Sequence, residues 1–279
     1  MDRLGWAAGI AFRAYGLDLG VRVNDPRLLS RVVECLPYGW KASRRPGVIH
    51  MYSLVGAPVS QTDAGADASR KLRRFNMLYS ESVQVARTLS LDDLFDVFES
   101  DVRQLVAEFA RKRVFVHAGV VGWRGRAIVI PGRSYSGKTS LVAELVRAGA
   151  TYYSDEYAVL DARGRVHPFA KPLSIRETGG YQQTDHSAEA LGGVVGSKPL
   201  RVGCVLVTEY RDGARWTPRP LSAGQSALSL LQNAVAARRT PEFVMQALRS
   251  ATEDARGFKT KRGEAADVVP RILAALDRE

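Results

Sequence analysis

A glycine-rich segment in the middle of the chain has the residue pattern of a phosphate-binding loop. Residues 132–139, GRSYSGKT, match the pattern G-x-x-x-x-G-K-[ST] in full. Apolar residues 127–130 precede the segment and an amphipathic stretch at 139–148 follows it, which is the strand-loop-helix context that such a loop requires. Gly132 and Gly137 allow backbone conformations that turn successive N–H groups toward one point, and the helix adds the positive end of its dipole. The segment therefore predicts a binding site for the phosphate chain of a nucleotide.

Each part of this loop has an expected task. Lys138 would reach the β- and γ-phosphates of ATP or another nucleoside triphosphate, and the hydroxyl of Thr139 would ligate Mg²⁺. Arg133 and Tyr135 occupy unrestricted positions of the pattern, where either could instead touch a substrate. The residues expected to surround the nucleotide are Gly132, Arg133, Ser134, Tyr135, Ser136, Gly137, Lys138, Thr139 and Ser140.

Phosphate chemistry also needs carboxylates, and an adjacent pair follows the loop. Residues 151–160 are expected to form one strand, with Asp155 and Glu156 at its end and beside the loop. One carboxylate can hold Mg²⁺, directly or through water, while the other takes the proton of an incoming hydroxyl. The alternative is that both acids are surface turn residues. The sequence thus offers Thr139, Asp155 and Glu156 as the metal site.

The elements that position these residues follow from hydrophobic periodicity. Residues 114–121 and 127–130 predict a hairpin around the turn at 122–125, and a helix at 139–148 leads to the strand at 151–160 and a turn at 161–164. Later, strands are expected at 202–210 and at Trp216 around a turn at 211–213, and helices start at Ser222, at Thr240 with Pro241, and at about residue 265. The first of these helices is expected to reach about Arg238. This order predicts an α/β (α+β) fold whose mixed sheet carries the nucleotide at its edge.

Residues 1–110 predict a small accessory α+β region. Strands are expected at 16–23, 48–55, 75–80 and 83–89, a short helix after Asp25, and a surface loop at 56–70. Ser90 is expected to cap a helix that ends near Arg113, because apolar residues recur at helical spacing behind it. Nothing in this region has the spacing of a catalytic constellation, so residues 111–279 are expected to form the catalytic domain.

Composition and charge exclude several classes of protein. The 279 residues are 46% hydrophobic and 25% charged, which is ordinary globular usage and excludes a disordered chain. Two distant cysteines, Cys35 and Cys204, argue against a disulfide scaffold and against a cysteine zinc site. No apolar stretch is long enough to span a membrane, so a cytoplasmic location is expected. Residues 1–110 hold 14 Lys and Arg against 13 Asp and Glu, whereas residues 111–279 hold 26 against 16. The basic excess favours anionic partners. Because the sequence has no long run of Lys and Arg, nucleic acid is not the partner that we expect.

Residues 115–176 resemble the catalytic domain of the HPr kinase/phosphorylase family. The resemblance rests on VHAGVV, GRAIVIPGRSYSGKTSLVAELVRAGATYYSDE and VHPFAKPLSIR, and it is closer to the kinase-like relatives of bacterial biosynthetic clusters, which include kinases of lasso-peptide precursors. The superfamily shares its nucleotide site with ATP-dependent phosphoenolpyruvate carboxykinase. Its features correspond here to His117, the loop at 132–139, Gly149, and Asp155 with Glu156. The resemblance implies phosphoryl transfer to a serine-type hydroxyl, with Asp155 as base and Thr139 plus Glu156 near the metal.

The sequence departs from the family pattern at two places, and both concern which substrate and which reaction the resemblance implies. The HPr-specific enzymes carry an Asp-Asp pair where this chain has Asp155 and Glu156, and residues 176–180, RETGG, are only a loose counterpart of their Glu-x-Arg-Gly signature. HPr itself and the reverse phosphorylase reaction are therefore not implied. Lys171 and Arg176 are candidates for holding phosphate or the acceptor, against the alternative of a solvated surface.

His117 and the segment at 221–225 each allow two interpretations. The expected strand of His117 runs beside the strand that feeds the loop, so His117 is either a core residue or a group that orients or tunes Asp155. Residues 221–225, LSAGQ, resemble the signature of ABC transporter ATPases, but no acidic strand follows them, and Ser222 with Gln225 predicts a helix capping box.

These observations predict an ATP-dependent kinase that phosphorylates a hydroxyl of a peptide, a protein or a small molecule, with Lys138, Asp155 and His117 as its catalytic residues. The alternative is a nucleotide-binding regulatory protein that hydrolyses slowly or not at all. A nucleic-acid-stimulated ATPase is supported by charge alone. The acceptor, the preferred nucleotide and the oligomeric state, including a homo-oligomer, stay open.

Overall fold

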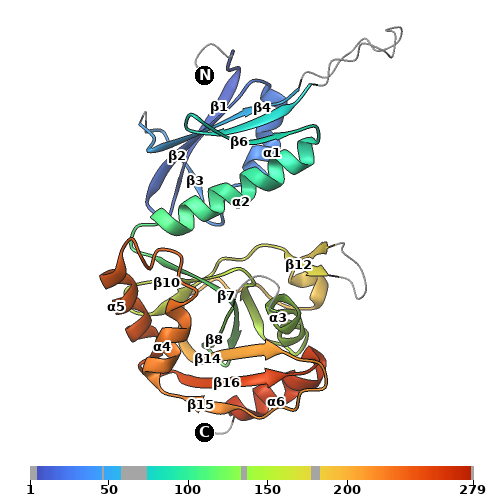
Figure 1. Cartoon of the computed structure of the whole chain (residues 1–279), viewed down its shortest axis with the longest axis vertical. Coiled ribbons are helices and arrows are strands. Elements are labelled where there is room, and N and C mark those ends of the chain that lie inside the picture. The colour runs from blue at the N-terminus through green and yellow to red at the C-terminus, as the bar shows by residue number, and fades with distance from the viewer. Residues whose placement is uncertain (1–4, 46, 58–73, 133–136, 177–182, 278–279) are drawn as a thin grey trace. The chain divides into compact units, whose positions relative to one another are not determined.

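The computed structural model describes residues 5–45, 47–57, 74–132, 137–176 and 183–277. The chain divides into two compact units, with the division between Arg111 and Lys112. This is one residue after the boundary expected from the sequence (Figure 1). That the second unit is the catalytic domain stays a prediction.

The N-terminal unit is built on a six-stranded sheet of order β3-β1-β2-β4-β5-β6. Tyr15 and Gly16 both have positive φ in the two-residue turn that joins β1 to β2, which is the conformation that matches the twist of an antiparallel hairpin. The strands are β1 (Ala8–Ala14), β2 (Leu17–Val23), β3 (Lys41–Ala42), β4 (His50–Val55), β5 (Asn76–Ser80) and β6 (Val83–Thr88).

Two helices accompany this sheet, α1 (Leu29–Glu34) and α2 (Leu91–Phe109). Ser90 caps α2 as expected, since its side chain accepts from the N–H of Asp93. The helix ends at Phe109 and not near Arg113, because Ala110 is already extended. The ring of Phe98 packs edge-on against Tyr52 of β4 at 5.3 Å, and an ion pair between Arg31 and Asp92 joins the two helices.

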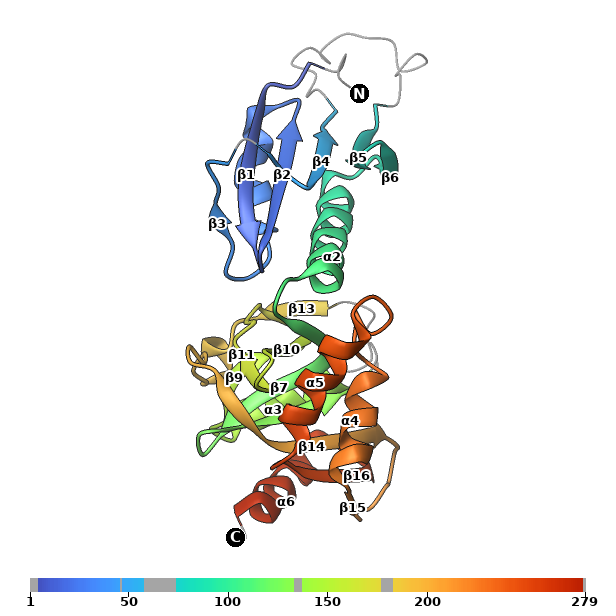
Figure 2. The ribbon, with the colours of Figure 1, turned by 90° about the vertical axis from the view of Figure 1, so that its left-hand side faces the viewer.

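The C-terminal unit contains a mixed eight-stranded sheet of order β11-β10-β7-β8-β14-β16-β15, with β9 also paired to β7 (Figure 2). β8, β14 and β16 are parallel to one another, and β7 and β15 run antiparallel to their neighbours. The strands are β7 (Val114–Trp123), β8 (Arg126–Pro131), β9 (Thr151–Ser154), β10 (Tyr157–Leu160), β11 (Arg165–His167), β14 (Leu200–Tyr210), β15 (Arg219–Leu221) and β16 (Arg256–Arg262); β12 (Leu173–Arg176) and β13 (Gln183–His186) form a separate pair.

Helices cover both faces of this sheet. Alternate residues of β8 point to opposite faces: Ile128 and Ile130 pack in the core with α3 and α6, whereas Ala127 and Val129 pack with α4 and α5 (Figure 1). The helices are α3 (Lys138–Arg147), α4 (Ala223–Leu231), α5 (Pro241–Thr252) and α6 (Ala265–Asp277). The expected α/β class with a mixed sheet is therefore confirmed, while its assignment to a kinase core stays a prediction.

Three sequence expectations about this unit were wrong. Trp216 lies outside the strands, and the strand of this region is β15, from Arg219. The helix after Ser222 ends at Leu231 and not near Arg238, because the chain then turns to hydrogen bond with β7 through Asn233 and Val235. The segment expected as one strand at 151–160 is two strands, β9 and β10. In the part of the chain that the structure describes, no helix has the length and apolar character needed to cross a membrane.

Candidate functional site

The expected phosphate-binding loop connects β8 to α3. β8 is an interior strand with β7 on one side and β14 on the other, so the loop leaves the carboxyl end of the middle of the sheet and not an edge strand. Gly132 directly follows β8, and its N–H donates to the carbonyl of His117 on β7 at 3.2 Å. Crevices at the carboxyl ends of such strands are common ligand sites in open α/β sheets.

Gly137 and Lys138 form the start of α3. Gly137 is the N-cap residue with φ of 77°, a left-handed conformation that favours glycine, and Lys138 is the first helical residue. Burial lowers the pKa of Lys138, while the charges of Asp155 and Glu156 act in the opposite direction. The ammonium group is therefore electrostatically coupled to both acids of the expected pair. Arg133, Ser134, Tyr135 and Ser136 lie outside the described residues, and Ser140 is exposed in the first turn of α3.

Gly119 lets α3 approach β7 closely. A Cβ at this position would lie 2.5 Å from Cγ2 of Val142 and 3.9 Å from the Cβ of Lys138. The missing side chain thus brings the first turns of α3 against the strand that also carries His117.

Asp155 and Glu156 occupy the interruption between β9 and β10. Both strands pair with β7: Ser154 lies opposite Val120, and Tyr157 lies opposite His117. The hydroxyl of Ser154 accepts from the N–H groups of Glu156 and Tyr157, at 3.1 and 3.0 Å, which satisfies the backbone where the ladder is broken. The acids therefore directly follow the end of β9, as the sequence predicted for the end of a strand, although a second strand, β10, begins immediately after them.

Asp155 is held on both of its carboxylate oxygens. The hydroxyl of Thr139 donates to Oδ2 at 3.3 Å, and the hydroxyl of Tyr152 lies 3.2 Å from Oδ1. The residue is only 7% exposed, and burial raises the pKa of its carboxyl group; Lys171 and the two hydroxyl groups pull the pKa back down, and Glu156 raises it further. A carboxyl group with a raised pKa is better matched to proton transfer near neutral pH than an exposed one.

Glu156 has a different set of neighbours. Its Oε2 forms an ion pair with Nζ of Lys171 at 3.2 Å. Burial lowers the pKa of the half-buried His117, Glu156 raises it and Lys138 lowers it, so the imidazole is coupled to these two charges. The ring of His117 also packs against Tyr157, with centroids 4.7 Å apart. The structure thus brings His117, Lys138, Thr139, Asp155, Glu156 and Lys171 together.

Magnesium fits this arrangement. Among the described residues, no group of three or more His, Cys, Asp and Glu side chains is arranged to hold a metal ion. Mg²⁺ at a phosphate chain, however, needs only one or two protein oxygens, with water and phosphate as its other ligands. The hydroxyl of Thr139 can supply one such oxygen, and the carboxylate of Glu156, next to the Asp155 that Thr139 contacts at 3.3 Å, can supply another.

Two site residues were missed in the sequence. Tyr152 lies inside the strand expected at 151–160 and has no separate motif, and its signal is its place three residues before Asp155. Arg262 was missed because β16 was not predicted; its signal is the alternation of basic residues with Phe258 and Thr260 in that strand. Arg262 Nη2 donates to the carbonyl of Gly137 at 2.7 Å.

Arg176 is not placed by the structure. Its backbone ends β12, which pairs with β13 away from the eight-stranded sheet, and its side chain lies outside the described part of the chain. The proposal that it holds phosphate or acceptor therefore rests on the sequence alone.

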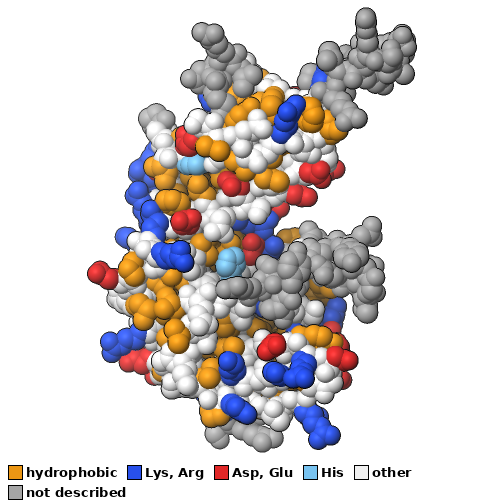
Figure 3. All heavy atoms as spheres, in the orientation of Figure 1, with side chains coloured by type: hydrophobic (Ala, Val, Ile, Leu, Met, Phe, Trp, Pro, Cys, Tyr) orange, Lys and Arg blue, Asp and Glu red, His pale blue; other side chains and the backbone are white. Residues whose placement is uncertain are grey.

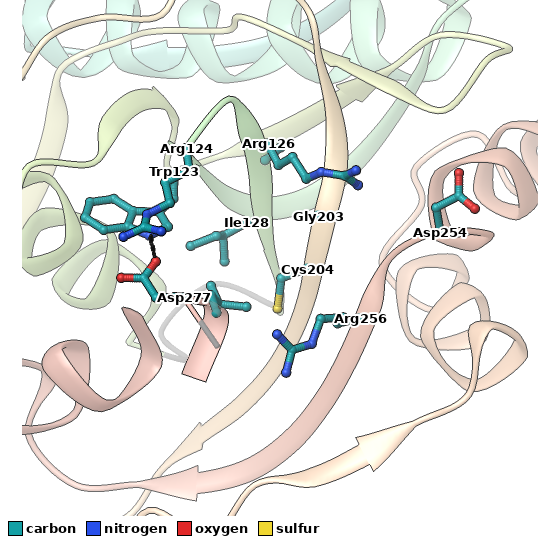
Figure 4. A pocket seen from close by; sticks show the side chains of 11 residues that line it. Trp123, Arg124, Arg126, Ile128, Gly203, Cys204, Asp254, Arg256 and Asp277 are labelled. Atoms are coloured by element: carbon teal, nitrogen blue, oxygen red, sulfur yellow. Dashed lines mark hydrogen bonds and ion pairs between the residues drawn. The ribbon is translucent and has the colours of Figure 1, made fainter. Parts of the chain in front are cut away.

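A pocket of about 440 Å³ lies at the other end of the strands, where β8, β14 and β16 begin (Figure 4). Asp277 of α6 closes one side, because it accepts from Trp123 Nε1 and pairs with Arg124, each at 2.9 Å. Neither Lys138 nor Asp155 lines this pocket. The candidate site is therefore defined by the loop and the acid pair.

The basic excess of residues 111–279 forms no broad field on the surface in view. On the face drawn in Figure 3, Lys and Arg side chains are interspersed with acidic, apolar and uncharged ones.

The chain was compared with known proteins. No protein family model and no curated protein sequence matches it.

Proposed function

We propose that the C-terminal unit is a Mg²⁺-dependent phosphotransferase that moves the γ-phosphate of ATP to a hydroxyl group of a peptide, a protein or a small molecule. The observation that carries the proposal is the contact of 3.3 Å between Thr139 and Asp155, directly beside Lys138. It joins the end of a complete G-x-x-x-x-G-K-[ST] loop to an acid that stands 16 residues later in the sequence. A loop of this kind alone binds phosphate, whereas a loop beside a carboxylate that is fixed by hydrogen bonds can also accept a proton from the acceptor.

The proposed reaction uses the residues in distinct tasks. Asp155 accepts the proton of the acceptor hydroxyl, whose oxygen forms a bond to the γ-phosphorus while the bond from that phosphorus to the β,γ-bridging oxygen breaks and ADP leaves. Lys138 neutralises charge on the phosphate chain, and Thr139 and Glu156 would hold a magnesium ion. When bound, Mg²⁺ would supply further neutralisation of the phosphate oxygens. The protein's contribution is mainly position and charge, as is usual in phosphoryl transfer.

Asp155 is the proposed base because it is the buried acid. Its pKa is raised, and both of its oxygens are oriented by hydroxyl groups. Glu156 is instead neutralised by Lys171. The resemblance of residues 115–176 to the HPr kinase/phosphorylase family supports the same division of roles.

The test compares Asp155→Asn with Glu156→Gln. General-base catalysis contributes about 10² to 10⁴ in rate, so Asp155→Asn should bind Mg²⁺-ADP within about threefold of wild type and transfer radiolabelled γ-phosphate to candidate peptides at least about a hundredfold more slowly. Glu156→Gln should mainly raise the Mg²⁺ concentration needed for transfer.

Opposite outcomes are equally clear. If Asp155→Asn retains full transfer, Asp155 is not the base. If Asp155→Asn instead raises the Mg²⁺ requirement and Glu156→Gln abolishes transfer, the two roles are exchanged. If wild type binds ATP and phosphorylates none of a broad set of hydroxyl acceptors, the regulatory nucleotide-binding reading replaces the kinase.

A further inference from the structure

Arg262 is a buried arginine at the last residue of β16. Its side chain is only 2% exposed, and it is the largest of the fully buried side chains among the described residues. Nη2 donates to the carbonyl of Gly137 at 2.7 Å and Nη1 donates to the carbonyl of Gly263 at 3.0 Å. Nε has no hydrogen-bond partner among the described residues.

Such burial is costly for a guanidinium group. Within the described residues, Arg262 takes part in no ion pair with a carboxylate, and burial lowers its pKa, with Glu264 and Tyr210 acting in the opposite direction. A buried charge without full compensation costs free energy, and groups of this kind concentrate where an arriving ligand supplies the compensation. Arg262 lies beside the expected phosphate loop, and an anion bound at that loop would have the charge that compensates a guanidinium group.

The contact with Gly137 fixes the direction of a peptide group. The carbonyl of Gly137 also accepts from the N–H of Leu141 at 3.3 Å, so it points along α3. The C=O and N–H of one trans peptide point in opposite directions. The N–H of Lys138 therefore points out of the amino end of α3, as the first free donors of a helix do. Arg262 adds a charge-assisted bond that opposes a flip of this peptide.

Gly137 and Arg262 also fit one another sterically. A Cβ on Gly137 would lie 2.6 Å from Nη2 of Arg262, and the φ of 77° already disfavours a side chain there. The glycine thus permits both the left-handed turn and the close approach of the guanidinium group.

We propose that Arg262 is a positioning residue for nucleotide binding: it clamps the Gly137–Lys138 peptide so that the N–H of Lys138 faces the phosphate chain of the bound nucleotide. The inference rests on the proposed function, since it assumes that a nucleotide binds at this loop. It assigns to β16, which carries no part of the sequence motif, a direct effect on that site.

The test uses Arg262→Gln and Arg262→Lys, with Arg256→Gln as the matched control. Arg256 lies on the same strand and also donates to a main-chain carbonyl, that of Ala275 at 3.0 Å, but it lines the pocket at the opposite end of β16. Calorimetry with Mg²⁺-ADP should give about tenfold or greater loss of affinity for Arg262→Gln, a smaller loss for Arg262→Lys, and affinity within about twofold of wild type for Arg256→Gln.

A spectroscopic readout separates positioning from mere structural support. With ¹⁵N-lysine labelling, the amide peak of Lys138 can be identified by its loss in Lys138→Arg. In wild type and in Arg256→Gln this peak should shift on addition of Mg²⁺-ADP, and in Arg262→Gln the shift should be reduced. A merely structural residue would lower the melting temperature without changing the response of this one peak.

The outcomes distinguish the two proposals. If wild type binds Mg²⁺-ADP and both Arg262 variants bind as tightly, the clamp is overturned and the proposed function stands. If wild type binds no nucleotide, both fall. If the Arg262 variants do not fold, the spectrum of wild type tests the proposal. A Lys138 amide peak that does not shift when wild type binds Mg²⁺-ADP contradicts the clamp.

Discussion

The hydroxyl of Tyr152 lies between two acceptors, 3.2 Å from Oδ1 of Asp155 and 2.8 Å from the carbonyl oxygen of Lys171. Burial raises the pKa of this phenol, and the charge of Asp155 raises it further, so the hydroxyl keeps its proton and acts as a donor. Since Thr139 contacts the other carboxylate oxygen, Asp155 is oriented from both sides. The orientation of the proposed base thus depends on a residue outside the loop motif.

Tyr152→Phe should slow phosphate transfer about tenfold while leaving Mg²⁺-ADP affinity nearly unchanged, because it removes one hydroxyl that orients Asp155 and no group expected to touch nucleotide. Steady-state kinetics and calorimetry measure the two effects. Tyr153→Phe is the control, since the hydroxyl of the neighbouring Tyr153 donates instead to the carbonyl of Lys198 at 2.7 Å. Equal rates for the two variants would contradict the orienting role.

Lys138→Ala and Gly137→Ala should both weaken nucleotide binding, for different reasons. Lys138→Ala removes the ammonium group that would neutralise the phosphates, whereas Gly137→Ala adds a Cβ at 2.6 Å from Arg262 and strains a backbone with φ of 77°. Gly137→Ala should therefore also lower the melting temperature. Glu144→Gln, further along the same helix where Glu144 pairs with Arg147, is the control. If Lys138→Ala bound Mg²⁺-ATP with unchanged affinity, residues 132–139 would not be the nucleotide-binding loop.

Asp161 should make folding stability depend on pH on the acid side. Burial pushes its pKa upward, but hydrogen bonds from His167, Arg165 and Arg163 outweigh that effect and bring the pKa down from 3.8 to about 2. Because the folded pKa lies below the unfolded one, the stabilisation is complete above about pH 4 and is lost as the pH falls toward 2. The contribution is about 1 to 2 kcal/mol.

Urea unfolding at pH 6.5 and at pH 3 measures this effect. Asp161→Asn should be less stable than wild type at pH 6.5, and the difference should shrink at pH 3. Asp212→Asn, in the exposed turn after β14, should show no such change between the two pH values. A difference for Asp161→Asn that is the same at both pH values would mean that the carboxylate charge is not involved.

Ser222→Ala should lower stability by about 1 kcal/mol without changing nucleotide affinity. Ser222 and Gln225 form the complete capping box of α4, as the sequence predicted for the LSAGQ segment. Thermal unfolding and calorimetry with Mg²⁺-ADP check the two halves of this prediction. A loss of nucleotide affinity with unchanged stability would favour the alternative reading as a nucleotide-contacting signature.

The sequence predicted those elements that are determined by residues close to one another in the chain. The hairpin of β7 and β8 was visible because Arg124 and Gly125 form a tight turn between apolar runs, and both have positive φ. The loop was visible because its pattern is short and contiguous. The interruption at Asp155 was not visible, because bulky strand-forming residues continue on both sides and the break arises from pairing with β7. β16 was missed because three of its seven residues are exposed and basic, and its strand character depends on its pairing with β14.

The parallel pairing of β16 with β14 has a consequence for the order of folding. β7 and β8 are joined by a two-residue turn and can pair early, whereas β16 reaches β14 only after the chain between them has closed a long loop. Arg262 arrives with the last residue of β16, so the peptide that it holds acquires its final orientation late. Pulse-labelling hydrogen exchange during refolding should therefore protect the amides of β8 before those of β16. In a chain emerging from the ribosome, the proposed nucleotide site would be incomplete until β16 has been synthesised.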